Sequence, residues 1–330
     1  MHESAVHDNL FYMRKITLGK SDLVVPAIAV GTMRISGAAK KDAEALVKTA
    51  LDEGANFFDL ADCYADGECD RAFADAVGMN ANLREKVILQ SKCGIYRDKS
   101  VTGGKYYMLT KEHILESVDG SLKRLKTDYL DILLLHRPDA LIEPAEVAEA
   151  LDKLKGSGKV RYFGVSNQHP MQIQLLQKYV RQPFIVNQLQ LSIVHAPMIS
   201  FGLTLNTIED TSLDRDGGVL DFCRLNDITI QTWSPFRYNV RENDKVLKGV
   251  FLDSDRYPEL NTAINKIAEK YGVSNTTIAL AWILRHPAQM QGVTGTTNAQ
   301  RLRDCIKATE ISLTYPEWYE IYLAAGNTLP

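Results

Sequence analysis

Four side chains that can transfer or direct protons stand at or just beyond the ends of short apolar segments. Asp59 lies near the end of the segment NFFDL, and Tyr64 follows five residues later. Lys92 ends the segment VILQSK, and His136 ends YLDILLLH. Burying a carboxylate, a phenol or an ammonium group is costly unless each has a partner. Taken singly, each residue has an ordinary explanation as a helix cap, a lysine that extends to solvent, or a hydrogen-bonded core histidine.

Together the four side chains have a coherent chemistry. A tyrosine hydroxyl has a pKa of about 10, and an ammonium group beside it favours the phenolate, so we expect Lys92 to lower the pKa of Tyr64. A carboxylate such as Asp59 keeps the lysine charged, and a histidine such as His136 orients a substrate oxygen. A proton donor aimed at a carbonyl oxygen, with no nucleophile nearby, suits hydride delivery to the carbon. The hydride must come from a nicotinamide, because no amino acid supplies one.

Short apolar segments rich in branched residues alternate with stretches of helical spacing throughout the sequence. Several segments are apolar along their whole length, which is typical of a parallel sheet covered by helices. Their number favours a closed (β/α)8 TIM barrel over an open sheet, and residues 15–27 are expected to form a β-hairpin that caps its bottom. The expected barrel strands are residues 26–31, 56–60, 87–92, 129–136, 160–166, 184–190, 228–233 and 290–295.

Three long segments, residues 94–110, 195–218 and 236–258, follow the third, sixth and seventh expected strands. They leave the carboxyl ends of the strands, which is the barrel face where active sites are built. We expect long irregular loops here, either ordinary solvated loops or the walls of a substrate pocket. The aromatic residues that would wall such a pocket are Tyr96, Tyr106, Tyr107, Phe201, Phe236 and Tyr238.

The composition restricts the classes of partner and compartment. The chain has 330 residues, 45% hydrophobic residues and a formal net charge of -3, which gives no electrostatic signature for nucleic acid or an anionic membrane. We expect a single domain over residues 13–330, preceded by a flexible extension over residues 1–12. The five cysteines of the chain form no C-x-x-C pair, which favours reduced thiols in a cytoplasmic protein. The expected oligomeric state is a monomer or a small homo-oligomer.

The segments FFDLADCYADGE, QSKCG, LLLHRPD, GVSN and NQLQLS, in this order along the chain, resemble the aldo-keto reductase superfamily. The resemblance extends over nearly the whole chain. It implies a catalytic tetrad in which Tyr64 is the general acid and Lys92 its pKa-lowering partner. It also implies that Asp59 is the counter-ion of the lysine and that His136 orients the carbonyl of a small-molecule aldehyde or ketone.

The same resemblance implies a nicotinamide cofactor. The residues that match those holding the carboxamide are Ser166, Asn167 and Gln188. Trp233 matches the aromatic residue that stacks on the nicotinamide ring. Arg301 matches the arginine whose guanidinium group binds a 2'-phosphate. The implied cofactor contacts are Gly31, Thr32, Met33, Asp59, Ser166, Asn167, Gln188, Trp233, Ser234, Pro235, Gly295, Thr296, Thr297, Arg301 and Asp304.

The sequence departs from the family pattern at the phosphate end of the cofactor site. Gly295 stands where many members have a lysine, and Asp304 and Cys305 stand where glutamate and asparagine are common. The expected cofactor is NADP(H), because Arg301 is present, with NAD(H) or use of both as the alternative.

Two other functions remain open at the level of sequence. Asp59, Asp62, His136 and Asp139 could be the ligands of a metal-dependent barrel hydrolase, although a lysine beside them repels a cation. A cofactor-binding regulatory subunit with little turnover is the second alternative. A dehydrogenase of the Rossmann type is excluded, because the only near match to G-x-G-x-x-G, GSGKVR, precedes a strand.

Overall fold

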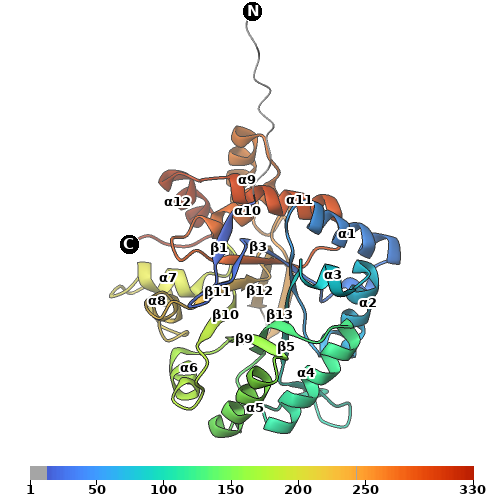
Figure 1. Cartoon of the computed structure of the whole chain (residues 1–330). Coiled ribbons are helices and arrows are strands. Elements are labelled where there is room, and N and C mark those ends of the chain that lie inside the picture. Colours follow the sequence, from blue (N-terminus) through green and yellow to red (C-terminus); the bar gives the residue numbers. More distant parts are fainter. Residues whose placement is uncertain (1–12, 243) are drawn as a thin grey trace, which may run out of the picture.

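The computed structural model describes residues 13–242 and 244–330, and the extension predicted for residues 1–12 lies outside this part of the chain. Eight parallel strands close into a barrel in the order β10-β11-β14-β3-β4-β5-β8-β9, with helices around it (Figure 1). The predicted (β/α)8 barrel is confirmed, and every predicted strand coincides with an observed one to within two residues. The barrel strands are β3 (Ile28–Gly31), β4 (Phe57–Asp59), β5 (Ile88–Cys93), β8 (Leu130–Leu135), β9 (Val160–Ser166), β10 (Phe184–Gln190), β11 (Thr229–Trp233) and β14 (Gln291–Thr294).

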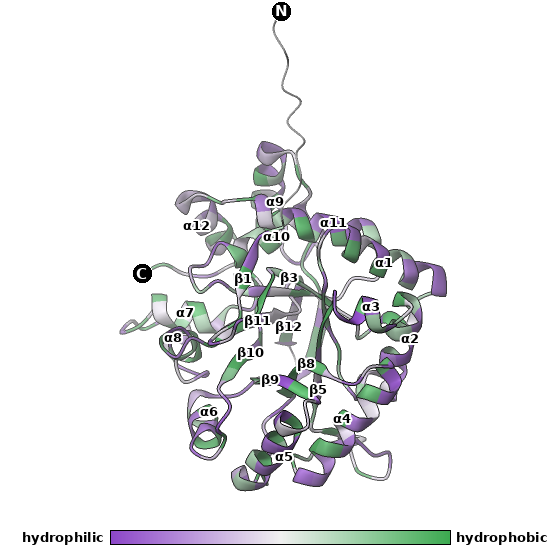
Figure 2. Ribbon diagram, viewed as in Figure 1, coloured by the Kyte–Doolittle hydropathy of each residue, from purple (hydrophilic) through white to green (hydrophobic). Residues whose placement is uncertain are grey.

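The helices that surround the barrel combine hydrophobic and hydrophilic residues, whereas the barrel strand β10 is largely hydrophobic (Figure 2). Helix α4 begins after Thr110, whose hydroxyl accepts a hydrogen bond from the backbone nitrogen of His113 at 3.3 Å and so caps the helix. The helices are α1 (Lys40–Asp52), α2 (Glu68–Val77), α3 (Ala81–Arg84), α4 (Lys111–Leu125), α5 (Pro144–Gly156), α6 (Pro170–Gln177), α7 (Pro197–Leu203), α8 (Val219–Leu225), α9 (Pro258–Tyr271), α10 (Asn275–Leu284), α11 (Ala299–Lys307) and α12 (Tyr315–Ala324). Short 3-10 turns are η1 (Ile35–Gly37), η2 (Tyr64–Gly67), η3 (Asp210–Ser212) and η4 (Ala308–Glu310).

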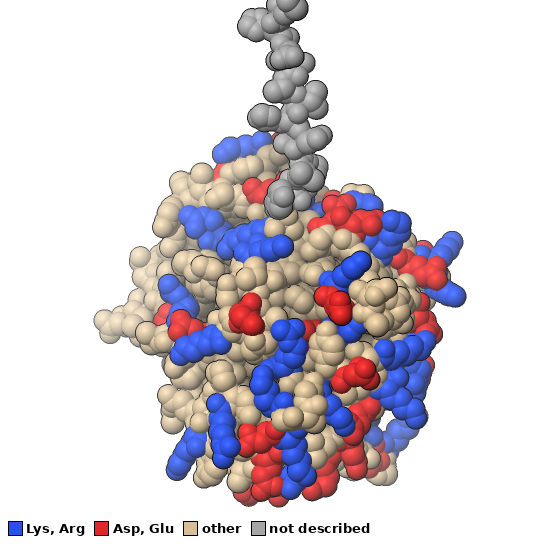
Figure 3. All heavy atoms as spheres, in the orientation of Figure 1, with Lys and Arg blue, Asp and Glu red and all other residues tan. Residues whose placement is uncertain are grey.

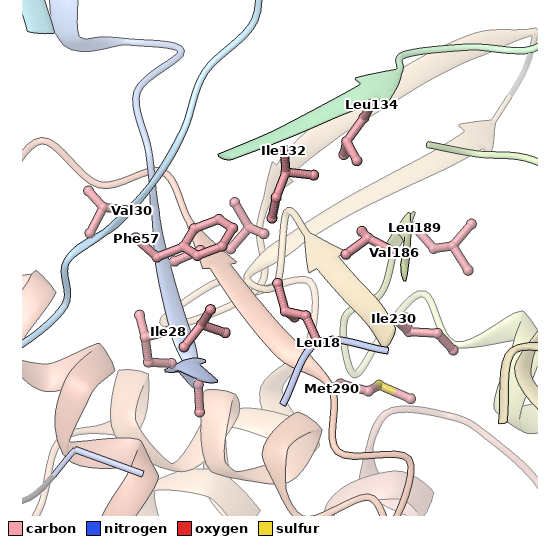
Figure 4. Packing of buried hydrophobic residues seen from close by; sticks show 14 of the residues in the cluster. Leu18, Ile28, Val30, Phe57, Ile132, Leu134, Val186, Leu189, Ile230 and Met290 are labelled. Atoms are coloured by element: carbon pink, nitrogen blue, oxygen red, sulfur yellow. The ribbon is translucent and has the colours of Figure 1, made fainter. Parts of the chain in front are cut away.

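Apolar side chains from several strands form one core, in which Val30, Phe57, Ile132 and Val186 are buried (Figure 4). All six residues of β8 are buried, because this strand is covered on both faces. Removing this apolar surface from water is the main force that holds the strands and helices together.

The predicted N-terminal hairpin is present as β1 (Lys15–Thr17) paired with β2 (Val24–Pro26). Between them, Leu18 is fully buried and the backbone nitrogen of Gly19 donates to the Thr229 hydroxyl at 2.8 Å. Gly19 has a φ of +46°, and a Cβ there would lie 2.5 Å from the Ile185 carbonyl oxygen. Only glycine allows the backbone to come this close to Ile185, and the hairpin thereby packs against the amino ends of the barrel strands.

The three long segments are more ordered than predicted. Residues 94–110 contain the paired strands β6 (Ile95–Arg97) and β7 (Lys105–Tyr107), and residues 236–258 contain β12 (Arg237–Glu242) and β13 (Lys245–Val250). The segment after β10 contains α7 and η3. The prediction of irregular loops missed cross-strand pairs, such as Tyr96 stacked on Tyr106 with ring centroids 5.0 Å apart, which stabilise short hairpins.

Three further features bear on the environment of the chain. Within residues 13–242 and 244–330, none of the helices has the length and apolar character needed to cross a membrane. Acidic and basic side chains are interspersed over the face seen in Figure 3. The five cysteines are buried free thiols: Cys63, Cys69, Cys93, Cys223 and Cys305.

Candidate active site

The ammonium group of Lys92 is the centre of the predicted site. Its Nζ lies 2.8 Å from Asp59 Oδ2, 2.8 Å from the Leu60 carbonyl oxygen and 3.1 Å from the Tyr64 hydroxyl oxygen. The Lys92 side chain is completely buried, and its three donors therefore have three partners. The structure thus brings together Asp59, Tyr64 and Lys92 as the sequence predicts.

The backbone after β4 places Tyr64 next to Lys92. Strand β4 pairs in parallel with β5, so Asp59 and Lys92 reach the same end of the barrel. The chain then makes a tight turn in which Ala65 and Asp66 have φ of +49° and +55°, a left-handed conformation that non-glycine residues rarely adopt. Gly67 follows with a φ of +89°. Such backbone strain costs about 1–3 kcal/mol per residue and is concentrated at functional sites.

Burial dominates the electrostatics of the tyrosine. It raises the pKa of the Tyr64 phenol above its ordinary value, although the charge of Lys92 acts in the opposite direction. Lys92 thus lowers the pKa of the phenol, as predicted, but desolvation of the phenolate outweighs this attraction and the net pKa is raised. Burial also penalises the Lys92 ammonium, but Asp59 and Tyr64 more than compensate and raise its pKa. A protonated phenol thus lies beside a charged lysine.

His136 joins the same site from the end of β8. Its ring lies edge-on to the Tyr64 ring, with centroids 5.9 Å apart. Burial holds the pKa of His136 well below its usual value, and the charges of Lys92 and Arg137 add to this effect. The imidazole is therefore neutral at neutral pH and has one N–H to donate. Its Nδ1 lies 3.7 Å from the Cys63 sulfur, a contact that the sequence did not suggest.

A buried network of glutamines supports the site from inside the barrel. Gln90 and Gln188 donate to Asp59 Oδ1 at 2.7 Å and 2.9 Å. Gln231 joins both of them and donates to Gln291 at 2.8 Å. These residues hold the carboxylate that faces Lys92. Sequence reasoning missed the network, although a glutamine inside each of four apolar strands was a visible signal.

The residues predicted to hold a carboxamide form one hydrogen-bonded chain. Ser166 donates to the Gln188 carbonyl oxygen at 2.9 Å, Asn167 donates to Ser166 at 2.7 Å, and Trp233 donates to Asn167 Oδ1 at 3.2 Å. Asn167 has a φ of +57°, which turns its side chain toward the ring of Trp233. The Nε2 of Gln188 is committed to Asp59 and Gln231, which leaves its Oε1 as the group available to a ligand.

Further predicted cofactor contacts lie where β3 ends, and the predicted phosphate-end residues lie where β14 ends. Thr32 bonds to the Asp59 carbonyl oxygen through its backbone nitrogen at 3.0 Å, which ties the first strand to the tetrad. Thr296 accepts from the Asn298 nitrogen, and Asn298 caps α11 by accepting from the Arg301 nitrogen at 2.9 Å. The other predicted contacts lie at strand ends or on α11. Gly31 ends β3 and Met33 follows it, Ser234 and Pro235 follow β11, Gly295 and Thr297 follow β14, and Asp304 lies in α11.

The ligands of the metal-dependent alternative are not gathered in one place. Asp59 is bound by Lys92, and Asp139 accepts hydrogen bonds from the backbone nitrogens of Leu109 and Leu141, both at 2.9 Å. Only Asp62 and His136 approach each other, in a group with Cys63 whose ligand atoms lie within 4.8 Å. This arrangement does not support the predicted four-residue centre.

Asp62 instead makes the stability of the protein depend on pH. Burial raises the pKa of this carboxyl from 3.8 to about 6, and its Oδ1 is buried without a hydrogen-bond partner. The folded protein therefore binds the proton more tightly than the unfolded chain does. The contribution of protonated Asp62 is fully present below the unfolded pKa and is lost as the pH rises through about 6.

We expect Asp62→Asn to stabilise the protein above about pH 7, by up to about 3 kcal/mol for a shift of about two pKa units. Below about pH 4 the variant should gain nothing, because both states of the wild type are then protonated. Denaturant unfolding of both proteins across this range measures the difference. Asp255→Asn removes an exposed acid and serves as the control, with no pH-dependent gain. A gain for Asp62→Asn that is the same at every pH would contradict the account.

A cavity of about 330 Å³ opens beside the site. Arg137, which follows His136, lines it together with Asn167 and Trp233. The nitrogen atoms Nε2 of Gln168 and Gln190, two further lining residues, are buried without hydrogen-bond partners. None of the loop aromatics predicted to wall a pocket lines this cavity, because its walls come from the ends of β8 to β11 and from the segment after β10. The remaining lining residues are His169, Gln172, Leu189, His195, Pro197, Met198, Arg215, Asp216 and Val219.

The fold and the site define a (β/α)8 barrel with a buried cluster of Asp59, Tyr64, Lys92 and His136 at the carboxyl ends of its strands. The model of the aldo/keto reductase family matches residues 27–322. The chain therefore belongs to the aldo/keto reductase family, as its motifs predicted.

Characterised and uncharacterised relatives agree with this assignment. The uncharacterized oxidoreductase YcsN of Bacillus subtilis is 32% identical over 96% of this chain and 100% of its own length. A 6-dehydroglucose reductase of Agrobacterium fabrum is 32% identical over 96% of this chain and 99% of its own length. Among solved structures, the thermostable aldo-keto reductase Tm1743, in complex with the inhibitor epalrestat, has a TM-score of 0.72 and 26% identity, and the match covers 94% of this chain and 100% of that one.

Proposed function

We propose that this protein is an NADPH-dependent reductase that converts an aldehyde or ketone to the alcohol, with Tyr64 as the general acid. The observation that carries the proposal is the buried Lys92 ammonium, bonded at once to Asp59 and to the Tyr64 hydroxyl. A fixed cation next to a phenol stabilises the phenolate that remains after the proton has left.

The residues present fit a nicotinamide cofactor. The indole of Trp233 is partly exposed next to Asn167, and Gln188 keeps a free acceptor oxygen for a carboxamide. Gly31 packs closely against β14, where a Cβ would stand 3.1 Å from the Thr294 carbonyl oxygen, so a larger residue would push the two strand ends apart. When bound, the reduced nicotinamide supplies a hydride to the carbonyl carbon.

The side chains of this chain then orient the carbonyl group and transfer the proton. The neutral His136 donates its N–H to the carbonyl oxygen and fixes the position of that oxygen beside Tyr64. As the carbon gains its hydride, the electron pair of the C=O bond moves to the oxygen, which takes the phenolic proton of Tyr64. Lys92 stabilises the resulting phenolate, and Asp59 keeps Lys92 charged. The raised pKa of Tyr64 favours the reduction direction, because the phenol is protonated at neutral pH.

The lining of the cavity suits an oxygen-rich substrate. Arg137 and Arg215 face it with one acid, Asp216, and the unpartnered amide nitrogens of Gln168 and Gln190 need acceptors. A polyhydroxylated or carboxylated carbonyl compound supplies such acceptors, whereas an alkyl aldehyde leaves them unsatisfied. The 6-dehydroglucose reductases among the relatives agree with this substrate class.

A comparison of matched carbonyl compounds tests the proposal. With NADPH, we expect a hydroxylated aldehyde to have a kcat/KM about 10- to 100-fold above that of the deoxygenated aldehyde of equal length, since each satisfied buried donor contributes about 1–3 kcal/mol. Consumption of NADPH in the steady state measures the rates, and a chelator should leave them unchanged. Equal rates for the two compounds would contradict the substrate class. Binding of NADPH without steady-state turnover of any carbonyl would favour the regulatory subunit.

A further inference from the structure

Three arginines gather at the part of the mouth where β3, β11 and β14 end. Arg34 follows β3, and its Nε donates to the Gly295 carbonyl oxygen at 3.0 Å, with a second bond from its NH2 group. Arg237 begins β12, directly after the turn that follows Trp233, and its backbone nitrogen donates to the Ser234 carbonyl oxygen at 3.1 Å. Arg301 lies in the first turn of α11. The three residues are far apart in the sequence and come from three different loops or helices.

No carboxylate neutralises this cluster. Within residues 13–242 and 244–330, none of the three guanidinium groups has an acidic partner within ion-pair distance. Partial burial lowers the pKa of Arg34, and the charges of Arg237 and Arg301 lower it further, so the three cations are near enough for their charges to interact. Like charges held together without a counter-ion repel one another, and a bound anion removes that repulsion.

Arg34 lies directly beside Gly295. A Cβ at Gly295 would stand 3.4 Å from the NH2 group of Arg34. Many members of the family have a lysine here, so the arginine from the β3 loop occupies the space next to the position that the lysine would hold. The charge is thus present in this chain, but a different part of the sequence supplies it.

The position of the cluster indicates which phosphate it meets. A dinucleotide that runs from Trp233 to the amino end of α11 passes the turn at Ser234 and then Gly295. Arg237 and Arg34 lie along this middle stretch, whereas Arg301 lies at its far end. The groups in the middle of a dinucleotide are the two bridging phosphates, and guanidinium forks bind phosphate oxygens in pairs.

Building on the proposed function, we propose that Arg34 and Arg237 bind the diphosphate bridge of the cofactor, with Arg34 replacing the lysine that is absent at residue 295. Arg301 would then bind the 2'-phosphate of NADPH. Because the diphosphate is common to NADPH, NADH and ADP-ribose, Arg34 contributes equally to the binding of all three, and Arg301 contributes only to that of NADPH.

Titrations of the full-length protein with these three ligands test the proposal. NADPH and NADH binding is followed by quenching of tryptophan fluorescence, and ADP-ribose by calorimetry. Arg34→Ala and Arg237→Ala are each expected to raise the Kd of every ligand by about tenfold or more, the loss of a charge-assisted hydrogen bond. Arg301→Ala should raise the Kd for NADPH alone. Arg303→Ala, on the same helix but paired with Glu53, is the control and should change none of them.

A second variant tests the replacement directly. Adding Gly295→Lys to Arg34→Ala restores a cation at the family's position, and the double variant is expected to regain most of the lost affinity. Thermal unfolding should be unchanged in Arg34→Ala, since the Arg34 side chain is largely exposed. Unaltered affinities in Arg34→Ala, a loss confined to NADPH, or no recovery in the double variant would each overturn the inference. Failure of the wild type to bind any of the three ligands would instead refute the proposed function.

Discussion

Replacing Tyr64 by phenylalanine is expected to lower kcat by about 10²- to 10⁴-fold, the usual contribution of a positioned general acid. The substitution removes only the hydroxyl that lies 3.1 Å from Lys92 Nζ. The ring and its edge-on contact with His136 remain, so the cofactor pocket keeps its shape. Steady-state kinetics and a cofactor titration on the same preparation measure the two effects separately, and we expect the Kd for NADPH to change by less than about twofold.

The matched control removes a hydroxyl far from the site. Tyr315 begins α12 and is largely exposed, so Tyr315→Phe should leave both kcat and the cofactor Kd at wild-type values. A Tyr64→Phe variant that turns over at the wild-type rate would exclude Tyr64 as the proton donor. A variant that also lost cofactor binding would show that the hydroxyl has a structural role instead.

Replacing Lys92 by methionine is expected to abolish turnover and to reduce the free energy of unfolding by about 3–5 kcal/mol, the cost of breaking a buried ion pair. The side chains of Lys92 and Asp59 are 0% and 4% exposed, so no water replaces the lost ammonium. Methionine has a similar length and leaves Asp59 with its two glutamine donors but without a cation. Denaturant unfolding and steady-state kinetics measure the two losses.

The double variant Lys92→Met/Asp59→Asn separates stability from chemistry. Removing the isolated carboxylate should restore much of the lost stability, because the amide that replaces it needs no counter-ion. Turnover should remain absent, since nothing then stabilises the Tyr64 phenolate. Wild-type stability in the single variant, or turnover in the double variant, would contradict the role given to this ion pair.

The fold was predictable from the sequence because each barrel strand carries a strong local signal. Segments such as YLDILLLH are apolar on both faces, and this pattern is typical of strands that helices cover. The tetrad was predictable for a related reason. Parallel strands end at the same face of a barrel, so residues that close neighbouring strands meet there. Tyr64 and Lys92 are therefore neighbours in space although 28 residues separate them in the sequence.

Other features depend on tertiary contacts that no local pattern specifies. The pKa of Tyr64 depends on how completely the phenol is desolvated, and this outweighs the neighbouring charge that the sequence suggested. The sequence suggested that the phosphate end of the cofactor site lacks a cation, because Gly295 stands where a lysine is common. Arg34, which we propose takes its place, lies in another loop. The hairpins in the segments after β5 and β11 were missed because pairing partners within a long segment become visible only once the chain is folded.

The most direct test of the account is a single turnover with NADPH that carries deuterium at the transferable position. After mixing with an aldehyde, we expect the deuterium on the former carbonyl carbon of the alcohol in the wild type, and at least about a hundredfold slower transfer in Tyr64→Phe. Deuterium released to water, or transfer at equal rates in the two proteins, would contradict a hydride transfer that depends on the proton of Tyr64.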